Sequence, residues 1–385
     1  MIPQRLVDVM VTLRRELHAR PELSFVEHHT MARIAAELDR LNVPHRVGVA
    51  GTGIVADLPG RHSDRPTVAL RADIDALPVQ EETGLPFAST VPGVMHACGH
   101  DGHTSMLVGA AAMLHADPPP APVRLLWQPA EEYGNGAVAM IEAGVLDGVS
   151  AIFGGHLDAN YPAGVLVVTD GCVNASTDSF RITIEGRQGH GARPHEALDV
   201  IVVGSLLVTA LQSVVSREVE PGQAAVVTVG RFEAGSAPNV IAGHAELEGT
   251  IRAQTATVRA QLNRSVERIA HGMAGLHGAR VTVRWFHGTP AAVNPPAATA
   301  TARAAAVAVV GADRVVPLAA TNMGGEDFAW YLQQVPGCYV RFGGRRPDGV
   351  FHPAHSGRFD FDERALPVGA AWYDRVARDA GEVSG

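Results

Sequence analysis

The chain is 385 residues long, with 46% hydrophobic residues, 18% charged residues and a formal net charge of −9. This composition is ordinary for a soluble globular enzyme and argues against a disordered or fibrous protein. The acidic balance leaves no basic surface for nucleic acid or an anionic membrane, so a small-molecule substrate is expected.

Length and cysteine usage set the next expectations. A chain of this size exceeds what one hydrophobic core usually serves, so two domains are expected. The three cysteines, at positions 98, 172 and 338, are too few and scattered for a disulfide framework and suit a reducing compartment. The first 17 residues are amphipathic, and no apolar stretch reaches the roughly 20 residues of a spanning helix. We expect a cytoplasmic protein with no membrane partner.

Helix and strand patterns alternate over the first 170 residues. Apolar residues at helical spacing predict helices over 4–18, 26–41 and 104–115. Short apolar, β-rich runs predict strands over 53–58, 67–72, 123–128, 151–156 and 164–169. This alternation predicts an α/β fold whose mixed sheet is largely parallel.

A dense cluster of metal-binding residue types follows the second of these strands. Residues 95–104 read Met-His-Ala-Cys-Gly-His-Asp-Gly-His-Thr. Cys98 and His100 stand at alternate positions, so in extended backbone both side chains leave on one side, and both are good ligands for a borderline metal. A metal site is the more specific interpretation of this stretch. The alternative is a polar loop in which Asp101 begins a helix.

Further candidate ligands stand at the ends of other strands. Glu131 and Glu132 follow the strand over 123–128, and His156 ends the strand over 151–156. Neighbouring side chains on extended backbone point apart, so one glutamate could bind metal while the other acts as a base. A charged turn is the alternative. Asp73 and Asp75, after the strand over 67–72, could orient a ligand histidine or form a turn.

The pattern changes near residue 175. Strands are predicted over 180–185, 225–232, 245–253 and 280–287, with helices over 198–217 and 256–275. This βαββαβ order is the ferredoxin-like plan, and it predicts an inserted domain. The chain then returns through a helix over 297–310, a strand over 338–342 and a final helix. We therefore expect a catalytic domain formed by residues 1–174 and 289–385, interrupted by a second domain over 175–288.

Ten short motifs, taken in order, carry a family resemblance. They are LRRELHARPELSFVE (13–27), RADIDALPV (71–79), MHACGHDGHT (95–104), WQPAEE (127–132), GGH (154–156), GRQGHGARPH (186–195), APNVI (237–241), GTIR (249–252), GGEDF (324–328) and HSGRFDFDE (355–363). Together they resemble the aminoacylase and hippurate-hydrolase branch of the dinuclear metallopeptidases, which includes plant auxin-conjugate hydrolases. The match runs nearly end to end and implies that the inserted domain is a lid and dimerisation domain.

The resemblance also implies the residues of a metal centre. The positions that match the family's metal ligands are Cys98, His100, Glu132, His156 and His355. Glu131 matches the general base. His355 is preferred to His352 because only His355 has the family's spacing to Phe359. Gly357 stands where the family often has proline, which makes His355 the least typical of the five.

The lid residues implied by the resemblance are His190, Asn239 and Arg252. His190 resembles a histidine that binds the reacting carbonyl, in dimers often that of the partner subunit. Asn239 and Arg252 resemble residues that contact the polar or carboxylate end of the substrate, and an arginine suits bidentate carboxylate binding. The alternatives are a lid-loop histidine without a catalytic part and a surface arginine.

The expected activity is hydrolysis of the amide bond of N-acyl amino acids by a metal-activated water. The resemblance implies two divalent ions, and the single thiolate favours zinc while the carboxylates leave manganese, cobalt or nickel open. The expected partners are a small-molecule N-acyl amino acid and a second copy of the chain, in a homodimer or dimer-based oligomer. A dipeptidase and a non-catalytic metal-binding relative are the alternatives. Glu131 argues against the second, since a structural site needs no spare carboxylate.

Overall fold

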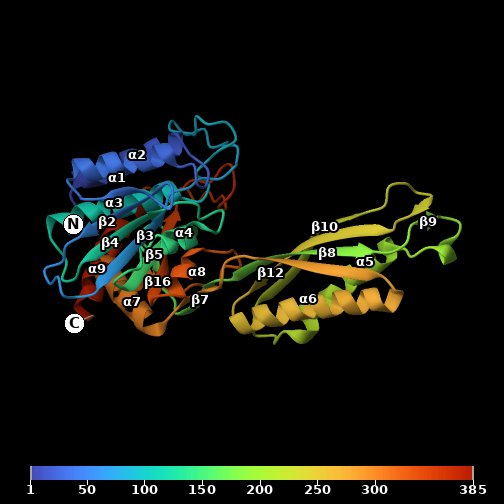
Figure 1. Cartoon of the computed structure of the whole chain (residues 1–385). Coiled ribbons are helices and arrows are strands. Elements are labelled where there is room, and N and C mark those ends of the chain that lie inside the picture. The colour runs from blue at the N-terminus through green and yellow to red at the C-terminus, as the bar shows by residue number, and fades with distance from the viewer. Residues whose placement is uncertain (1, 384–385) are drawn as a thin grey trace. The chain divides into compact units, whose positions relative to one another are not determined.

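The computed structural model describes residues 2–383 and divides into two compact units. Unit 1 consists of Met1–Val173, Val293–Ala320 and Asp327–Gly385. Unit 2 consists of Asn174–Ala292 and the short segment Thr321–Glu326. The elements of both units are labelled in Figure 1.

Unit 1 is built on an eight-stranded mixed sheet. Its strands, in spatial order, are β1 (Arg46–Val49), β2 (Gly53–Leu58), β4 (Val123–Gln128), β3 (Thr67–Asp73), β5 (Val149–Pro162), β16 (Gly337–Arg345), β6 (Leu166–Val167) and β15 (Val315–Val316). The central strands β4, β3, β5 and β16 pair in parallel, whereas β1, β2 and β4 pair antiparallel. The predicted mixed, largely parallel α/β sheet is confirmed.

Helices cover this sheet. They are α1 (Gln4–Ala19), α2 (His28–Arg40), α3 (His100–Ala116), α4 (Gly136–Glu142), α7 (Pro296–Val310), α8 (Phe328–Leu332) and α9 (Ala365–Val383), with a 3-10 turn at Ala312–Arg314. α3 is buried along most of its length because it is rich in Ala and Gly. A Cβ at Gly109 would lie 2.3 Å from Met10 Sδ on α1 and 2.9 Å from Ala370 Cβ on α9. Small residues therefore let α1 and α9 approach α3 closely.

The topology of the sheet brings distant loops to one edge. In parallel strands the carboxyl ends lie at the same edge, where α/β proteins bind ligands. Asp73 ends β3, and the Glu131–Glu132 pair follows β4. His156 lies within β5, opposite Arg341 of β16 in the parallel register. The short strands β7 (Gly171–Asn174) and β14 (Ala292–Asn294) pair where the chain passes between units.

Unit 2 is a four-stranded antiparallel sheet with two long helices. Its elements in chain order are β8 (Ser176–Glu185), α5 (Val200–Ser213), β10 (Ala225–Ala234), β12 (His244–Ala253), α6 (Ala256–His277) and β13 (Arg280–His287). The spatial order β10-β12-β8-β13 is that of the predicted ferredoxin-like plan. A two-stranded sheet, β9 (Gly189–His190) with β11 (Val240–Ile241), and a 3-10 turn at Pro194–Glu196 complete the unit.

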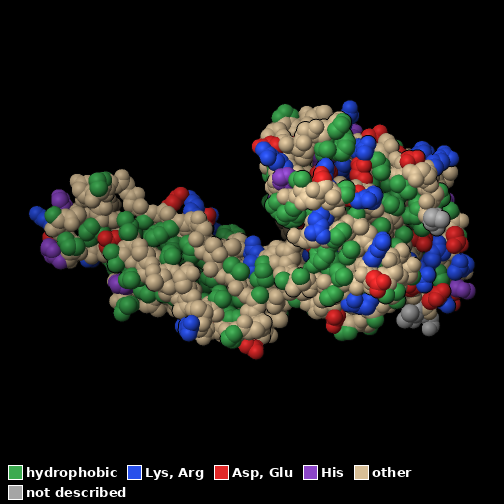
Figure 2. Space-filling model, turned by 180° about the vertical axis from the view of Figure 1, so that it is seen from behind, with side chains coloured by type: hydrophobic (Ala, Val, Ile, Leu, Met, Phe, Trp, Pro, Cys, Tyr) green, Lys and Arg blue, Asp and Glu red, His purple; other side chains and the backbone are tan. Residues whose placement is uncertain are grey.

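One helical stretch of unit 2 is unusually apolar. α5 continues through a π turn, and the whole helical stretch extends over Val200–Glu218. Its most apolar 18 residues have a mean hydropathy of 1.7, and 33% of them are buried. By length and composition it could cross a membrane, although a core helix of a soluble protein passes the same test. Its buried side packs on the unit 2 core, while Ile201, Val202 and Leu206 are exposed. Figure 2 shows many hydrophobic and few charged side chains on the drawn face of this unit.

Candidate metal centre and active site

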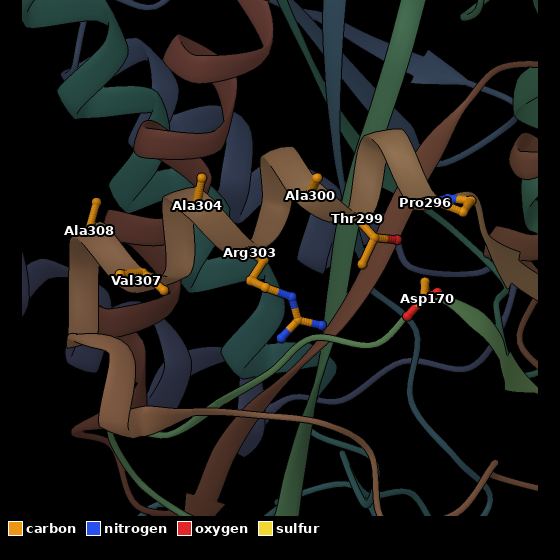
Figure 3. Close-up of a pocket in the computed structure, with 8 residues that line it drawn as sticks. All are labelled: Asp170, Pro296, Thr299, Ala300, Arg303, Ala304, Val307 and Ala308. Atoms are coloured by element: carbon orange, nitrogen blue, oxygen red, sulfur yellow. The ribbon is translucent and has the colours of Figure 1, made fainter.

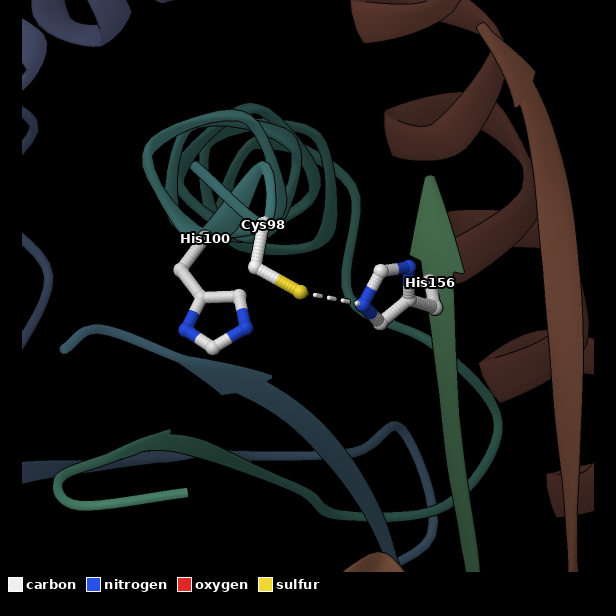
Figure 4. A group of neighbouring side chains, drawn as sticks. All are labelled: Cys98, His100 and His156. Carbon is white, nitrogen blue, oxygen red and sulfur yellow. Dashed lines mark hydrogen bonds between the residues drawn. The ribbon is translucent and has the colours of Figure 1, made fainter. Parts of the chain in front are cut away.

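Cys98 and two histidines form the first group of potential metal ligands. His100 is the first residue of α3, and Gly99 before it has a φ of 87°, a conformation that glycine adopts without strain. Cys98 Sγ lies 3.2 Å from Nε2 of His156, which β5 presents (Figure 4). One potential ligand atom from each of Cys98, His100 and His156 lies within 4.8 Å of the others. The predicted pair from the 95–104 stretch therefore meets the predicted histidine of β5.

Cys98 also belongs to a second group. Ligand atoms of Cys98, Glu132 and His355 lie within 4.8 Å of one another, and His355 Nε2 is 3.4 Å from Glu132 Oε1. His355 has a φ of 68°, uncommon for a residue with a side chain, and its backbone N–H donates to Ala97 O at 2.8 Å. The structure thus brings all five predicted ligands together, in two groups that share one sulfur.

Glu131 lies beside both groups. Its Oε2 is 4.0 Å from His100 Nε2, and its Oε1 accepts a hydrogen bond from the backbone N–H of Asp327 at 3.4 Å. The expectation that Glu131 and Glu132 point apart assumed extended backbone, but both lie in a turn and both carboxylates approach His100. This turn follows Ala130, whose φ is 54° and whose N–H donates to Glu27 Oε1.

Asp75 orients several groups of the centre at once. Its Oδ1 is 3.2 Å from His100 Nδ1, and its Oδ2 accepts hydrogen bonds from Ser24 Oγ at 2.7 Å and the Glu132 backbone N–H at 3.0 Å. Burial raises the pKa of Asp75, but the hydrogen bond and charge of His100 outweigh it, so the pKa lies below its usual value. Such a carboxylate fixes the ring orientation of a ligand histidine.

Asp73 performs a different task. Its Oδ1 lies 2.6 Å from His103 Nδ1, and His103 Nε2 accepts a hydrogen bond from the Leu157 backbone N–H at 2.7 Å. Both ring nitrogens of His103 are therefore engaged, and His103 supports β5 rather than offering a ligand atom. Arg71 pairs with the other oxygen of Asp73 at 2.5 Å.

The donor set fits divalent metal ions. His100 Nε2 and Glu132 Oε1 are buried and make no hydrogen bond within residues 2–383. A buried polar atom without a partner is costly, and a coordinated ion would satisfy both atoms. Burial, with the nearby charge of Glu132, raises the pKa of the Cys98 thiol well above its usual value. Metal binding would therefore have to displace the thiol proton.

The predicted lid residues lie at two ends of unit 2. His190 of β9 pairs with Val240, and the Gly191 N–H donates to Asn239 O at 2.8 Å, so His190 and Asn239 are exposed neighbours. Arg252 of β12 pairs with Thr177 at the start of β8, whereas His190 follows the end of that ten-residue strand. At about 3.3 Å per residue, the part of β8 from Thr177 to Glu185 places the two ends of unit 2 roughly 26 Å apart.

One hollow in unit 1 contains none of these residues. It has a volume of about 610 Å³, and it is formed by one side of α7 with Asp170 opposite (Figure 3). Alanine and valine make up half of its lining residues, and Arg303 is the cation drawn there. It offers no cluster of ligand or acid–base groups comparable to the two groups that contain Cys98.

Sequence reasoning missed Arg14, which contacts residues next to the ligands. Arg14 and His18 lie one turn apart on α1, both buried, on the side that also buries Met10, Leu13 and Leu17. The sequence contained one signal for Arg14, because this charged residue stands on the apolar side of a predicted helix. A charge that is buried there requires partners. His18 Nδ1 lies 2.8 Å from Asp101 Oδ2, so His18 is a hydrogen-bonded residue beside the start of α3.

Comparison with known proteins places this geometry in a family. A model described as peptidase family M20/M25/M40 matches residues 69–379. The N-acetylcysteine deacetylase of Bacillus subtilis (strain 168) is 41% identical over 375 residues, which cover 96% of each protein. IAA-amino acid hydrolase ILR1-like 4 of Arabidopsis thaliana is 38% identical over 378 residues, which cover 96% of this chain and 85% of that protein.

A solved structure agrees with these sequence relatives. The crystal structure of the Bacillus subtilis YXEP protein, described as a dinuclear metal binding peptidase from the M20 family, superposes with a TM-score of 0.88. The two chains are 36% identical, and the match covers 99% of each. The resemblance inferred from the motifs is confirmed, and the chain belongs to peptidase family M20/M25/M40.

Proposed function

We propose that this chain, a metal-dependent hydrolase of amide bonds, releases a carboxylic acid and a free amino acid from N-acyl amino acids. The observation that carries the proposal is the position of Glu131, a carboxylate 4.0 Å from His100 beside two ligand groups that share Cys98. The names of the Bacillus deacetylase and the Arabidopsis IAA-amino acid hydrolase support this substrate class.

The five ligands would hold two divalent ions with Cys98 as the shared ligand. His100 and His156 complete one group, and Glu132 and His355 complete the other. A thiolate with imidazoles and a carboxylate favours zinc, and manganese, cobalt and nickel are compatible. When bound, such a pair of ions supplies Lewis acidity and lowers the pKa of a water held between them.

Glu131 would move the protons of the reaction. Its carboxylate would accept the proton of the attacking water and later donate it to the nitrogen of the leaving amine. The Asp327 N–H, 3.4 Å from Oε1, holds one oxygen, and the other faces His100. Asp75 would keep the His100 ring turned toward the same place through its contact with Nδ1.

Unit 2 would serve as lid and dimerisation domain. Because His190 and Asn239 lie a strand length from Arg252, one small substrate could not touch both ends of unit 2 in the same chain. We propose that His190 and Asn239 act on the substrate of a partner subunit, where His190 polarises the reacting carbonyl. Arg252 would bind the free carboxylate of the substrate. The exposed apolar side of α5 supports a homodimer. The proposed location of the protein is the cytoplasm.

The test measures metal content and amino-acid release together. Purified protein is analysed for bound metal and incubated with N-acetyl, N-benzoyl and indoleacetyl amino acids, and with unmodified dipeptides. Release from the acylated substrates, lost in Glu131→Gln at unchanged metal content, is the expected result. Turnover of dipeptides alone would indicate a dipeptidase. Bound metal without turnover of any substrate would indicate a non-catalytic relative.

A further inference from the structure

Arg14 of α1 has an uncommon set of partners. Its side chain is 1% exposed, and each of its three guanidinium nitrogens faces a different carboxylate. The distances are 3.0 Å from Nε to Asp101, 2.9 Å from one Nη to Asp360 and 3.2 Å from the other Nη to Glu363. A planar guanidinium presents its donors in fixed directions within one plane, whereas the three donors of an ammonium group rotate about a single bond.

Two aromatic rings fix the plane of this guanidinium. Its central carbon lies 4.6 Å from the centroid of Phe87 and 4.5 Å from that of Phe361. Each distance is within the range of a cation–π contact. Arg14 is thus held by hydrogen bonds at its edges and by rings at its faces, so its position is closely defined.

The three carboxylates belong to two segments that carry proposed ligands. Asp101 directly follows His100, and its Oδ1 accepts the Gly102 N–H at 2.9 Å in the first turn of α3. Asp360 and Glu363 belong to the segment that follows His355. The two segments also touch directly, because a Cβ at Gly102 would lie 2.6 Å from the Phe361 ring. One buried cation therefore joins the start of α3 to the segment after His355.

We infer that Arg14 is a positioning residue that holds His355 in place relative to Cys98 and Glu132, and so raises the metal affinity of that ligand group. The inference rests on the proposed metal centre. His355 needs such support because its side chain is 55% exposed and its backbone has the uncommon φ of 68°. Cys98, Glu132 and their neighbours lie on or beside the central sheet and α3, whereas His355 arrives on a loop.

The effect should be selective for one group of ligands. His156 lies within β5 and His100 is oriented by Asp75, and neither depends on the segment after His355. Loss of Arg14 should therefore weaken the Cys98–Glu132–His355 group more than the Cys98–His100–His156 group. Residues that orient metal ligands typically change metal affinity about 10–100-fold when substituted.

The test compares Arg14→Gln with Arg15→Gln. Arg15 is the matched control because it stands on the same helix and binds Glu363 at 2.6 Å, but its side chain is 48% exposed and its acidic contact is with the segment after His355 alone. Metal-free wild type and variants are titrated with zinc against a chromophoric chelator, and circular dichroism verifies the fold. We expect two binding events in all three proteins, with one weakened about 10–100-fold in Arg14→Gln alone.

A second variant covers a failure of Arg14→Gln to fold. Asp360→Asn removes one of the two charge partners of Arg14 on the segment after His355 and leaves Arg14 with Asp101 and Glu363, so it should weaken the same binding event. Two unchanged zinc affinities in a folded Arg14→Gln or Asp360→Asn protein would overturn the inference. That result would leave the proposed function intact, because the wild type would still bind two ions and release amino acid. A wild type that binds no metal would instead refute the proposed function itself.

Discussion

Cys98 Sγ lies 3.2 Å from His156 Nε2, and the same sulfur forms a second ligand group with Glu132 and His355. If the Cys98 thiolate is shared as proposed, the two metal positions would be interdependent, because each would lose a ligand when the sulfur is removed. The remaining ligands would be two for each ion, fewer than the three or four protein ligands usual for zinc.

Substitution of Cys98 should therefore remove more metal than substitution of a ligand in one group. In Cys98→Ala the metal content should fall from two ions per chain to below one, whereas His156→Ala should retain about one. Elemental analysis of purified protein after dialysis provides the measurement. Cys338→Ala is the control, since Cys338 is a buried cysteine of β16 whose sulfur lies by Thr299. Two ions per chain in Cys98→Ala would refute the shared ligand.

Glu131 should be needed for turnover but not for metal. Glu131→Gln keeps the shape of the side chain and its acceptor oxygen toward the Asp327 N–H, but it cannot take the proton of the attacking water. General acid–base residues typically contribute about 10²–10⁴-fold, so kcat should fall by that factor. The neighbouring change Glu132→Gln should instead lower the metal content. Retention of wild-type kcat in Glu131→Gln would assign the base elsewhere.

Strand-end reasoning located part of the centre from the sequence because parallel strands share an edge. Glu131, Glu132 and His156 were candidate ligands because each stands at or just after the end of a predicted strand. His355 offered no such signal, since it lies in a loop, and only the family resemblance pointed to it. The turn at Glu131 depends on a hydrogen bond from Ala130 N–H to Glu27, a contact between distant positions that local patterns do not contain.

The fold was predictable where the hydrophobic pattern of a segment and the length of that segment indicated the same kind of element. The predicted order of the ferredoxin-like elements matches β8, α5, β10, β12, α6 and β13. β5 was predicted over 151–156 but extends over Val149–Pro162, because its pairing with β16 continues as far as Pro162. The apolar pattern of residues 157–162 is weak, and only the partner strand defines where β5 ends.

An ion pair in unit 2 should make the stability of this unit depend on pH. Asp178 on β8 is buried and accepts hydrogen bonds from Arg259 on α6 and from the Gly288 N–H. Burial raises the pKa of Asp178, but the bonds with Arg259 outweigh it, so the pKa in the folded state lies below the usual value. A depressed carboxyl pKa stabilises the fold above the unfolded pKa of about 3.9, and this contribution is lost as the pH falls through the folded pKa.

Asp178→Asn tests this contribution. At pH 7 the free energy of unfolding of the variant should be about 2 kcal/mol lower than that of the wild type, which is the scale of a hydrogen bond to a charged group. The difference should shrink below about pH 4, where Asp178 of the unfolded chain becomes protonated, and should be lost once the pH falls through the lower pKa of the folded state. Urea unfolding monitored by hydrogen exchange in β8 and α6, with a chelator in every sample, measures it. A difference independent of pH would attribute the effect to packing.

The separation of His190 from Arg252 predicts complementation between subunits. If His190 acts on the substrate of a partner, a mixed dimer of His190→Ala and Glu131→Ala chains contains one site with both residues intact. Each variant alone should be inactive, and the mixture should recover up to about a quarter of wild-type activity, since half of the dimers are mixed and each has one complete site of two. Amino-acid release is measured after subunit exchange, which native mass spectrometry of a tagged and an untagged chain verifies.

Exchange without recovered activity would show that His190 acts within its own chain or has no part in hydrolysis. A mixture of His190→Ala with Asn239→Ala is the matched control, because both residues lie at the same end of unit 2 and each site in the mixed dimer receives one defective lid end.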